Sequence, residues 1–509
     1  MRAQQALSRD GVTHRAQIPF NKDLSAILRR AGRNALWLII SEALGKGSFV
    51  LANIFLARLL TSYGYGTLAL AQTWVLYAVL IVDFGIGMYG QREAARRSEM
   101  DQLGRLADEI FSLKLVLGFL VFVPFSLFCW LLVSQPVVRL TDFACGIYLI
   151  GYGASLDWLF RGREKYEVVL LVNFLSSASF LVSLLLTVSG ADKAPIAGFL
   201  WSGSCILCSL LYLFRCSHLI GRPIRFRFPF SRWLAHLRDS AFFSLSGVFM
   251  QSYQYLPLVL LSWFTPKEIV GFFAAPYRLI IHLGSLGFLI PMAFYPISAR
   301  LFGENSELFN DTRRLLLFAM LVCGPPIAIF GTIIAIPLMI TVFGPGFRES
   351  ASLFRIIVWL VPLYCIRYVY GSTMLSTGFQ RLHLRASMVG FVTALLSGFL
   401  LGAYFRAFGI AASTLLAEGV IIGALASSSY KVHGHLSIPA RSEVFRLVLL
   451  NGVLAATGLW LNSHIGWIAC LTFAALGYPI GLWILQLGSI RQISDLFLKN
   501  APTHAGNEA

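Results

Sequence analysis

Charged side chains lie inside the long apolar runs of this 509-residue sequence, where each one needs a partner, water or a task. Arg278, His282 and Ser285 follow one another at spacings of four and three, so they share one helical face. The residues three and four positions from Arg278 include no carboxylate, so no ion pair within its own helix neutralises it. This arginine therefore indicates a position that faces an interior rather than lipid.

A second polar face occurs in the first apolar run. Glu42, Lys46 and Asn53 are spaced by four and seven residues, which again places them on one side of a helix. The alternative is that Glu42 and Lys46 only neutralise each other, as an ion pair four residues apart that lets the helix insert. A further cation, Arg367, also lies inside an apolar run.

Buried carboxyl groups are candidates for ion coupling, because they can exchange a proton or a sodium ion when a cavity changes sides. Glu42, Glu418 and Asp83 are the three candidates. Asp83 has a simpler alternative explanation, since it stands near a helix end that water can reach. Lys114 is expected in the first turn of its helix, from which its side chain can extend to the membrane interface.

These residues must be positioned by membrane-spanning helices. The sequence is 57% hydrophobic and only 13% charged, and its apolar runs reach the roughly 20 residues that a helix needs to cross a bilayer. A β-barrel would show shorter, alternating segments. We therefore predict an all-α polytopic membrane protein with fourteen spans, twelve being the alternative. The expected spans are 34–60, 65–89, 110–134, 141–160, 168–190, 195–214, 240–263, 268–299, 315–342, 351–376, 384–405, 409–429, 442–461 and 465–488.

The net charge of +17 is explained by topology rather than by nucleic-acid binding. With the N-terminus inside, thirty Lys and Arg residues fall in cytoplasmic segments and six in outer loops, as the positive-inside rule requires. Both termini are then cytoplasmic. The arginine-rich stretch that starts at Arg222 is expected to lie on anionic lipid headgroups.

Two halves of the chain resemble each other. The turn from Thr61 to Gly66 is repeated near Thr265 to Gly271, about two hundred residues later. Six helices per unit give two copies of the same orientation, related by an axis along the membrane normal. The expected organisation is a basic tail 1–33, a first lobe 34–214, a linker 215–239, a second lobe 240–432, an extra helix pair 433–488 and a tail 489–509.

Four motifs together carry a resemblance to a known family. They are the Thr61 to Gly66 turn, Asp83-Phe-Gly-Ile-Gly87, Asp157-Trp-Leu-Phe-Arg-Gly-Arg-Glu-Lys-Tyr166 and Val270-Gly-Phe-Phe-Ala-Ala-Pro-Tyr-Arg278. With this order and spacing, the chain resembles the polysaccharide repeat-unit flippases, often called Wzx-type, of the MATE-like superfamily. The resemblance extends from Asn34 to about Gly488 and implies the two-lobed fold of that superfamily.

The resemblance also implies a substrate, an oligosaccharide on a polyprenyl diphosphate, moved across the bacterial inner membrane for surface polysaccharide synthesis. Arg278, Lys46 and Arg367 are then the candidate ligands of the diphosphate, because charge-assisted hydrogen bonds to phosphate are strong. The candidate sugar contacts are Asn53, Gln251, Gln254, Tyr253, Tyr255 and His282. A polysaccharide polymerase is a possible partner.

Other functions remain as alternatives. A lipid-linked peptidoglycan precursor flippase and an ion-coupled multidrug exporter belong to the same superfamily. A membrane-embedded polymerase or ligase is disfavoured, because the external loops are too short to hold catalytic groups. We expect no enzyme activity, cofactor or metal; Cys205 and Cys208 have metal-ligand spacing, but no histidine or carboxylate nearby completes a site.

Overall fold

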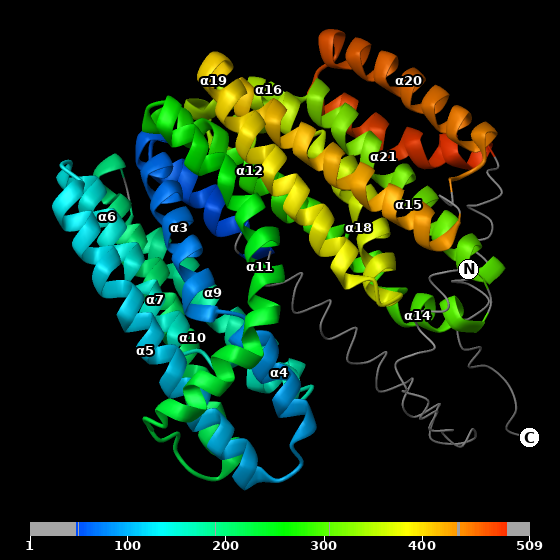
Figure 1. Ribbon diagram of the computed structural model, residues 1–509. Coiled ribbons are helices and arrows are strands. Elements are labelled where there is room, and N and C mark those ends of the chain that lie inside the picture. The colour runs from blue at the N-terminus through cyan, green and yellow to red at the C-terminus, as the bar shows by residue number, and fades with distance from the viewer. Residues whose placement is uncertain (1–46, 49, 189, 305, 435–437, 486–509) are drawn as a thin grey trace, which may run out of the picture.

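The computed structural model describes residues 47–48, 50–188, 190–304, 306–434 and 438–485, and all regular elements in these ranges are helices (Figure 1). The first is the short apolar helix Val50–Leu59. It is followed by α3 (Ser62–Asp83), α4 (Ile86–Arg96), α5 (Met100–Leu132), α6 (Pro136–Gly146), α7 (Tyr148–Gly153), α8 (Asp157–Gly162), α9 (Tyr166–Thr187), the 3₁₀ turn Ala191–Lys193 and α10 (Ala194–Ile220).

The second half of the chain is also helical in its described residues. Its elements are α11 (Phe230–Phe264), α12 (Lys267–Leu286), α13 (Leu289–Ala293), α14 (Tyr295–Glu304), α15 (Ser306–Ile333), α16 (Ala335–Phe343), the 3₁₀ turn Pro345–Phe347, α17 (Ser350–Ile357), α18 (Leu360–Ser376), α19 (Gln380–His433), α20 (Arg441–His464) and α21 (Trp467–Ile484).

In the described residues, eleven helices or runs of consecutive helices are long and apolar enough to cross a membrane, so the chain is a multi-pass membrane protein and the all-helical fold class is confirmed. One of the eleven, α19, is 54 residues long and contains the non-helical residue Arg406, with φ 51° and ψ −124°. Its halves fold back on each other, since the hydroxyl oxygens of Ser397 and Ser413 are 2.8 Å apart. It thus contains the two spans expected at 384–405 and 409–429. The total of fourteen stays a prediction.

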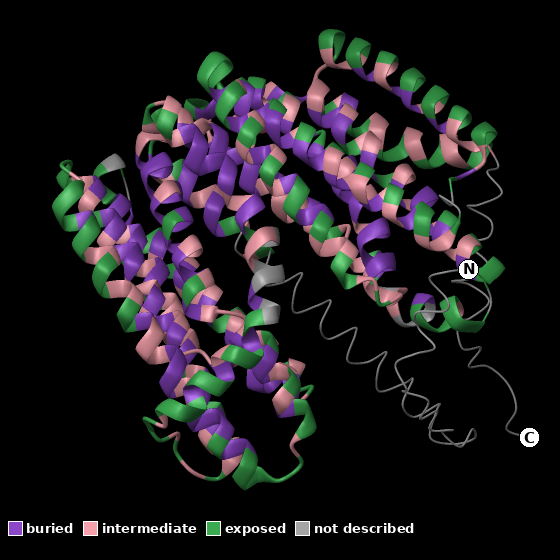
Figure 2. Cartoon of the chain, in the orientation of Figure 1, coloured by how far each residue is buried: buried purple, intermediate pink, exposed green. Residues whose placement is uncertain are grey.

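The helices gather into two bundles (Figure 1). One holds α3 to α10, the other holds α12 to α19, and α20 and α21 lie at the outer edge of the second bundle. The outer faces of the two bundles are largely exposed (Figure 2), as expected of surfaces that contact lipid. That the bundles are parallel repeats stays a prediction.

Helix α11 joins the bundles. Near its start, His236 contacts Tyr89 of α4 and Glu109 of α5; further along, Tyr253 contacts Glu418 of α19. The segment expected as a linker, 215–239, includes the end of α10 and the start of α11, so its non-helical part is 221–229.

Short polar and glycine signals end these helices. The Thr61 hydroxyl accepts a hydrogen bond from the Gly64 N–H and caps α3. At the other end, Phe84 (φ 39°) and Gly85 (φ 74°) both adopt left-handed backbone angles and separate α3 from α4. The Asp83-Phe-Gly sequence therefore fixes where the Asp83 side chain stands, on the last residue of α3.

The bundles meet most closely where α3 crosses α12. A Cβ atom added at Gly66 would lie 2.0 Å from the Lys267 carbonyl oxygen, and one added at Gly271 would lie 2.0 Å from the Ser62 carbonyl oxygen. Only glycine fits at either position, because the clashing atoms belong to backbone. The repeated glycine turns of the sequence are thus the contact that brings the bundles together.

Candidate functional site

Arg278 lies between the bundles and is bound by neutral groups. It belongs to α12 and is buried, and its Nη1 donates to Asn53 Oδ1 at 3.0 Å and to Gln72 Oε1 at 2.7 Å. Its Nη2 donates to the Ala69 carbonyl oxygen at 3.1 Å. Among the described residues no carboxylate forms an ion pair with it, so the positive charge is solvated but not neutralised.

The partners of Arg278 form a small network on the other bundle. The Tyr65 hydroxyl donates to Asn53 Oδ1 at 3.2 Å, and the Tyr65 ring lies 5.9 Å from the guanidinium carbon. His282, one turn further along α12, borders a cavity of about 10 Å³ with Asn53 and Arg278, which is too small for a ligand. In this conformation Arg278 therefore fastens one bundle to the other.

Arg367 and Glu418 form an ion pair inside the second bundle. Arg367 Nε lies 2.6 Å from Glu418 Oε1, and the Tyr253 hydroxyl donates to Glu418 Oε2 at 2.8 Å. The guanidinium lies 5.1 Å from the Tyr364 ring and 5.0 Å from the Tyr368 ring. The expected substrate ligand Arg367, the coupling candidate Glu418 and the sugar candidate Tyr253 are thus one buried network.

The first bundle holds a second ion pair that the sequence did not reveal. Lys114 Nζ lies 3.4 Å from Asp83 Oδ1, the Tyr152 hydroxyl donates to the same oxygen at 3.1 Å, and Lys114 lies 4.5 Å from the Tyr152 ring. The expectation that Lys114 reaches the interface is wrong. Because α5 begins at Met100, Lys114 stands about four turns into the helix, and its side chain is only 1% exposed.

The remaining sugar candidates lie on α11. The Tyr255 hydroxyl donates to Gln251 Oε1 at 3.1 Å, and the Tyr255 ring packs edge-on against Tyr77 of α3, at 5.6 Å between ring centroids. Gln254 is half-buried and receives a hydrogen bond from Tyr277 on its backbone carbonyl, which leaves its amide side chain out of that contact. These groups lie where α11 faces α3.

Two candidates, Glu42 and Lys46, lie outside the described residues. A groove of about 1060 Å³ exists elsewhere, between α20 and α21, but apolar residues such as Leu454, Phe473 and Ile480 line it and none of the candidate cations does. In the described ranges, no group of three His, Cys, Asp or Glu residues is arranged to hold a metal ion.

Comparison with known proteins places the chain in a family. Residues 31–302 match the family described as polysaccharide biosynthesis protein. The chain belongs to this family. It is also 23% identical over 375 residues to a putative O-antigen transporter of Shigella dysenteriae, covering 72% of this chain and 91% of that protein. A putative O-antigen transporter of Escherichia coli strain K12 is 24% identical over 400 residues, covering 77% and 95%.

Solved structures show the same fold for this polysaccharide biosynthesis protein. The lipid II flippase MurJ in an inward closed conformation matches with a TM-score of 0.68 at 11% identity, over 92% of this chain and 99% of that one. An inward-facing multidrug resistance MATE family transporter of the MOP superfamily matches with a TM-score of 0.61 at 14% identity, over 78% and 95%. At such identities the likeness concerns the fold alone.

Proposed function

We propose that this member of the polysaccharide biosynthesis family moves polyprenyl-diphosphate-linked oligosaccharide units across the bacterial inner membrane, as a transporter and not an enzyme. The putative O-antigen transporters that align with most of its length support this substrate class. The two bundles would expose the substrate site alternately to each side. We infer that both termini are cytoplasmic, from the excess of Lys and Arg in the inner segments.

The observation that carries the proposal is the position of Arg278. Its hydrogen-bond partners Gln72 and Ala69 belong to α3 of the opposite bundle, so movement of the bundles apart would remove both bonds at once. The guanidinium would then need new acceptors. A diphosphate supplies them, because two phosphate oxygens match the two-nitrogen fork of an arginine.

The other proposed ligands follow from the same movement. Lys46 would add a second positive charge, whereas Arg367 would contribute only the part of its charge that Glu418 leaves uncompensated. The sugar contacts would come from Asn53, Gln251 and His282, and also from Gln254, Tyr253 and Tyr255. A polysaccharide polymerase remains the proposed partner.

Ion coupling is proposed to involve a carboxyl group, with Asp83 as the first candidate. Its side chain is 25% exposed and pairs with Lys114, so water can bring a proton to it. Glu418 is fully buried against Arg367, and Glu42 remains a candidate from the sequence.

The direct test is transport by the purified protein in liposomes. A fluorescent polyprenyl-diphosphate oligosaccharide is placed in both leaflets, and the fraction that an impermeant glycosidase removes is followed over time. We expect the protected fraction to fall in the presence of the protein, and to fall much more slowly with the lipid-linked peptidoglycan precursor. Equal rates with and without protein would refute transport, and preference for the peptidoglycan precursor would replace the substrate.

A further inference from the structure

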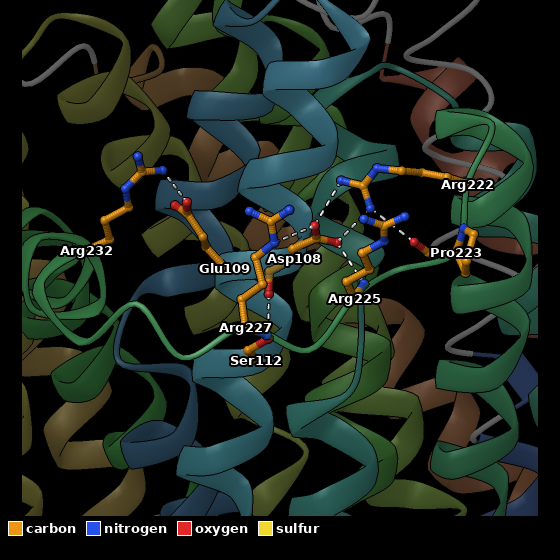
Figure 3. Close-up of polar contacts among 8 residues, drawn as sticks. All are labelled: Asp108, Glu109, Ser112, Arg222, Pro223, Arg225, Arg227 and Arg232. Carbon is orange, nitrogen blue, oxygen red and sulfur yellow. Dashed lines mark hydrogen bonds and ion pairs between the residues drawn. The ribbon is translucent and has the colours of Figure 1, made fainter.

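Two neighbouring acidic residues of α5, Asp108 and Glu109, hold the non-helical segment 221–229, which joins α10 to α11 (Figure 3). These two carboxylates are called the acidic clamp below. Asp108 is fully buried and accepts hydrogen bonds from Arg222 Nη2 at 2.9 Å and from the Arg225 N–H at 2.9 Å. Arg227 Nε lies 3.4 Å from Asp108 Oδ2. The hydrogen bonds to Asp108 also raise the pKa of Arg222, so its charge is retained.

The neighbouring acid, Glu109, extends the clamp to the start of α11. It pairs with Arg232, and His236 Nε2 lies 3.1 Å from its other carboxylate oxygen. The Tyr89 hydroxyl is 3.0 Å from His236 Nδ1. Residues 222 to 234, called the clasp segment below, are thus held on the first bundle at both ends.

The clamp fixes which way the side chains of the clasp segment point. The N–H groups of Arg225 and Arg227 donate to Asp108 and to Ser112, which are four residues apart on α5. One helical turn advances about 5.4 Å and two residues of extended chain about 6.6 Å, so the two spacings match. The segment is therefore extended, and alternate residues lie on alternate sides.

The face opposite Arg227, whose side chain reaches Asp108 of α5, is apolar and exposed. Phe226 is 56% exposed and Phe228 65% exposed, and on the first turns of α11 Phe230 and Leu234 are 68% and 61% exposed. Monomeric soluble surfaces rarely gather large apolar side chains in this way. On α10, Phe214 is also 60% exposed.

Charge identifies what covers this patch. The clasp segment carries four arginines, Arg222, Arg225, Arg227 and Arg232, against the two carboxylates of the clamp, which leaves a net charge of +2. Figure 3 shows all four around the clamp, and the Arg225 guanidinium is the one with no ion pair among the described residues. An anionic lipid leaflet matches both the apolar patch and the excess positive charge.

We propose that the clasp segment is a lipid-binding surface, in which its four exposed apolar side chains enter the leaflet and Arg225 bonds an anionic headgroup. The sequence expectation placed the arginines on the lipid; in the structure three of them pair with the carboxylates of the clamp, although Arg227 and Arg232 remain 44% and 63% exposed, and the proposal gives contact with the acyl chains to the apolar side chains. The proposal goes beyond the transport function and depends on the proposed orientation only for which leaflet is bound.

The test measures the depth of single labels in the full-length protein. Phe226→Cys, Phe228→Cys and, as the matched control, the exposed Gln102→Cys on α5 are made after the eight native cysteines are replaced, and each is labelled with a small fluorophore. The protein is reconstituted in bilayers of phosphatidylcholine with or without phosphatidylglycerol. Quenching by spin-labelled lipid is compared with quenching by aqueous iodide.

We expect lipid quenching at 226 and 228 to exceed that at 102 by about threefold or more, to increase with phosphatidylglycerol, and to lose that increase in Arg225→Gln. Iodide quenching at 226 and 228 equal to that at 102 in both bilayers would overturn the proposal. A second outcome would also overturn the proposal. If the labels at 226 and 228 are protected from iodide only after a cell extract is added to the purified protein, the surface binds a protein partner instead of lipid. If the cysteine-free protein does not fold, a genetically encoded fluorescent amino acid at 226, 228 and 102 gives the same readout.

Discussion

Each bundle contains a buried cation, a carboxylate and a tyrosine, and the two sets differ in the exposure of the carboxylate. In the first bundle Lys114 pairs with Asp83 beside Tyr152, and the Asp83 side chain is 25% exposed. In the second bundle Arg367 pairs with Glu418, whose side chain is fully buried. The residue types are similar, but the carboxylate of Asp83 is partly exposed and that of Glu418 is fully buried.

This difference separates two roles. A sealed ion pair is costly to form and more costly to break, because removing one partner leaves an unpaired charge in a medium of low dielectric constant. A carboxylate that water reaches can be protonated without opening the protein. We therefore infer that Arg367 and Glu418 stabilise the second bundle, whereas Asp83 and Lys114 are placed for ion exchange.

The largest expected effect is the loss of Arg367. Arg367→Ala should destabilise the protein by about 3–5 kcal/mol, because Glu418 would remain buried without its cation. Thermal unfolding of the purified protein measures this, with Arg355→Ala as the control, since Arg355 is exposed on α17. An Arg367→Ala protein that unfolds at the same temperature as the Arg355→Ala protein would mean that the pair is not structural.

Arg278 differs from both pairs, since its described partners are neutral. Arg278→Ala should reduce transport about ten- to a hundredfold, the range expected for losing a hydrogen bond to a charged group, and Arg278→Lys should fall between Ala and wild type. Membrane abundance and surface polysaccharide are measured together. Normal output from a well-expressed Arg278→Ala protein would remove Arg278 from the substrate site and leave Lys46 as the first remaining candidate, since the charge of Arg367 is paired with Glu418.

The sequence predicted the helices but not these pairs. Apolar length is a local signal, so most spans were placed correctly, and the two glycine turns were found as a repeat. The Arg367–Glu418 pair joins residues on different helices, and Lys114 meets Asp83 only because α3 and α5 pack together. Helical spacing reveals neighbours within a helix and is silent about neighbours between helices.

One local error explains the misplacement of Lys114. The first turns of α5 are polar, with Asp101, Asp108 and Glu109, so the helix was expected to begin where the apolar run begins. In the structure two of these acids, Asp108 and Glu109, pair with arginines of the clasp segment, which lie more than a hundred residues later in the sequence. The contact could have been suggested by two features of the sequence together: the acidic residues in the first turns of α5 and the arginine-rich clasp segment.

Loss of Lys114 should be less damaging than loss of Arg367. Lys114→Met leaves Asp83 unpaired, but water reaches this carboxylate, so we expect destabilisation toward the lower end of about 1–3 kcal/mol. The same unfolding measurement checks it. A loss as large as that of Arg367→Ala would show that the first pair is sealed as well, and the comparison between the bundles would fail.

Asp83→Asn tests the exchange role without removing a hydrogen-bonding side chain. Transport driven by a proton or sodium gradient should drop to the rate seen without a gradient, while downhill exchange of substrate should continue. Glu418→Gln and Glu42→Gln are measured in the same liposomes. If gradient-driven transport survives in Asp83→Asn and is lost in one of the other two, the coupling site belongs to that residue instead.

The smallest expected effect concerns the neutral groups between the bundles. Gln251 is exposed, and its side-chain oxygen accepts a hydrogen bond from Tyr255, so its amide N–H groups can face a sugar hydroxyl. A neutral hydrogen bond is worth about 0.5–1.5 kcal/mol, so Gln251→Ala should slow transport only a few-fold. Tyr255→Phe removes the group that orients Gln251 and leaves the amide in place, so its effect should be smaller still. Transport rates at several substrate concentrations distinguish a sugar contact from a packing role. If Gln251 contacts the sugar, Gln251→Ala should lower the apparent affinity for the substrate. An unchanged affinity with a lower maximal rate would assign Gln251 to the packing of α11 against α3.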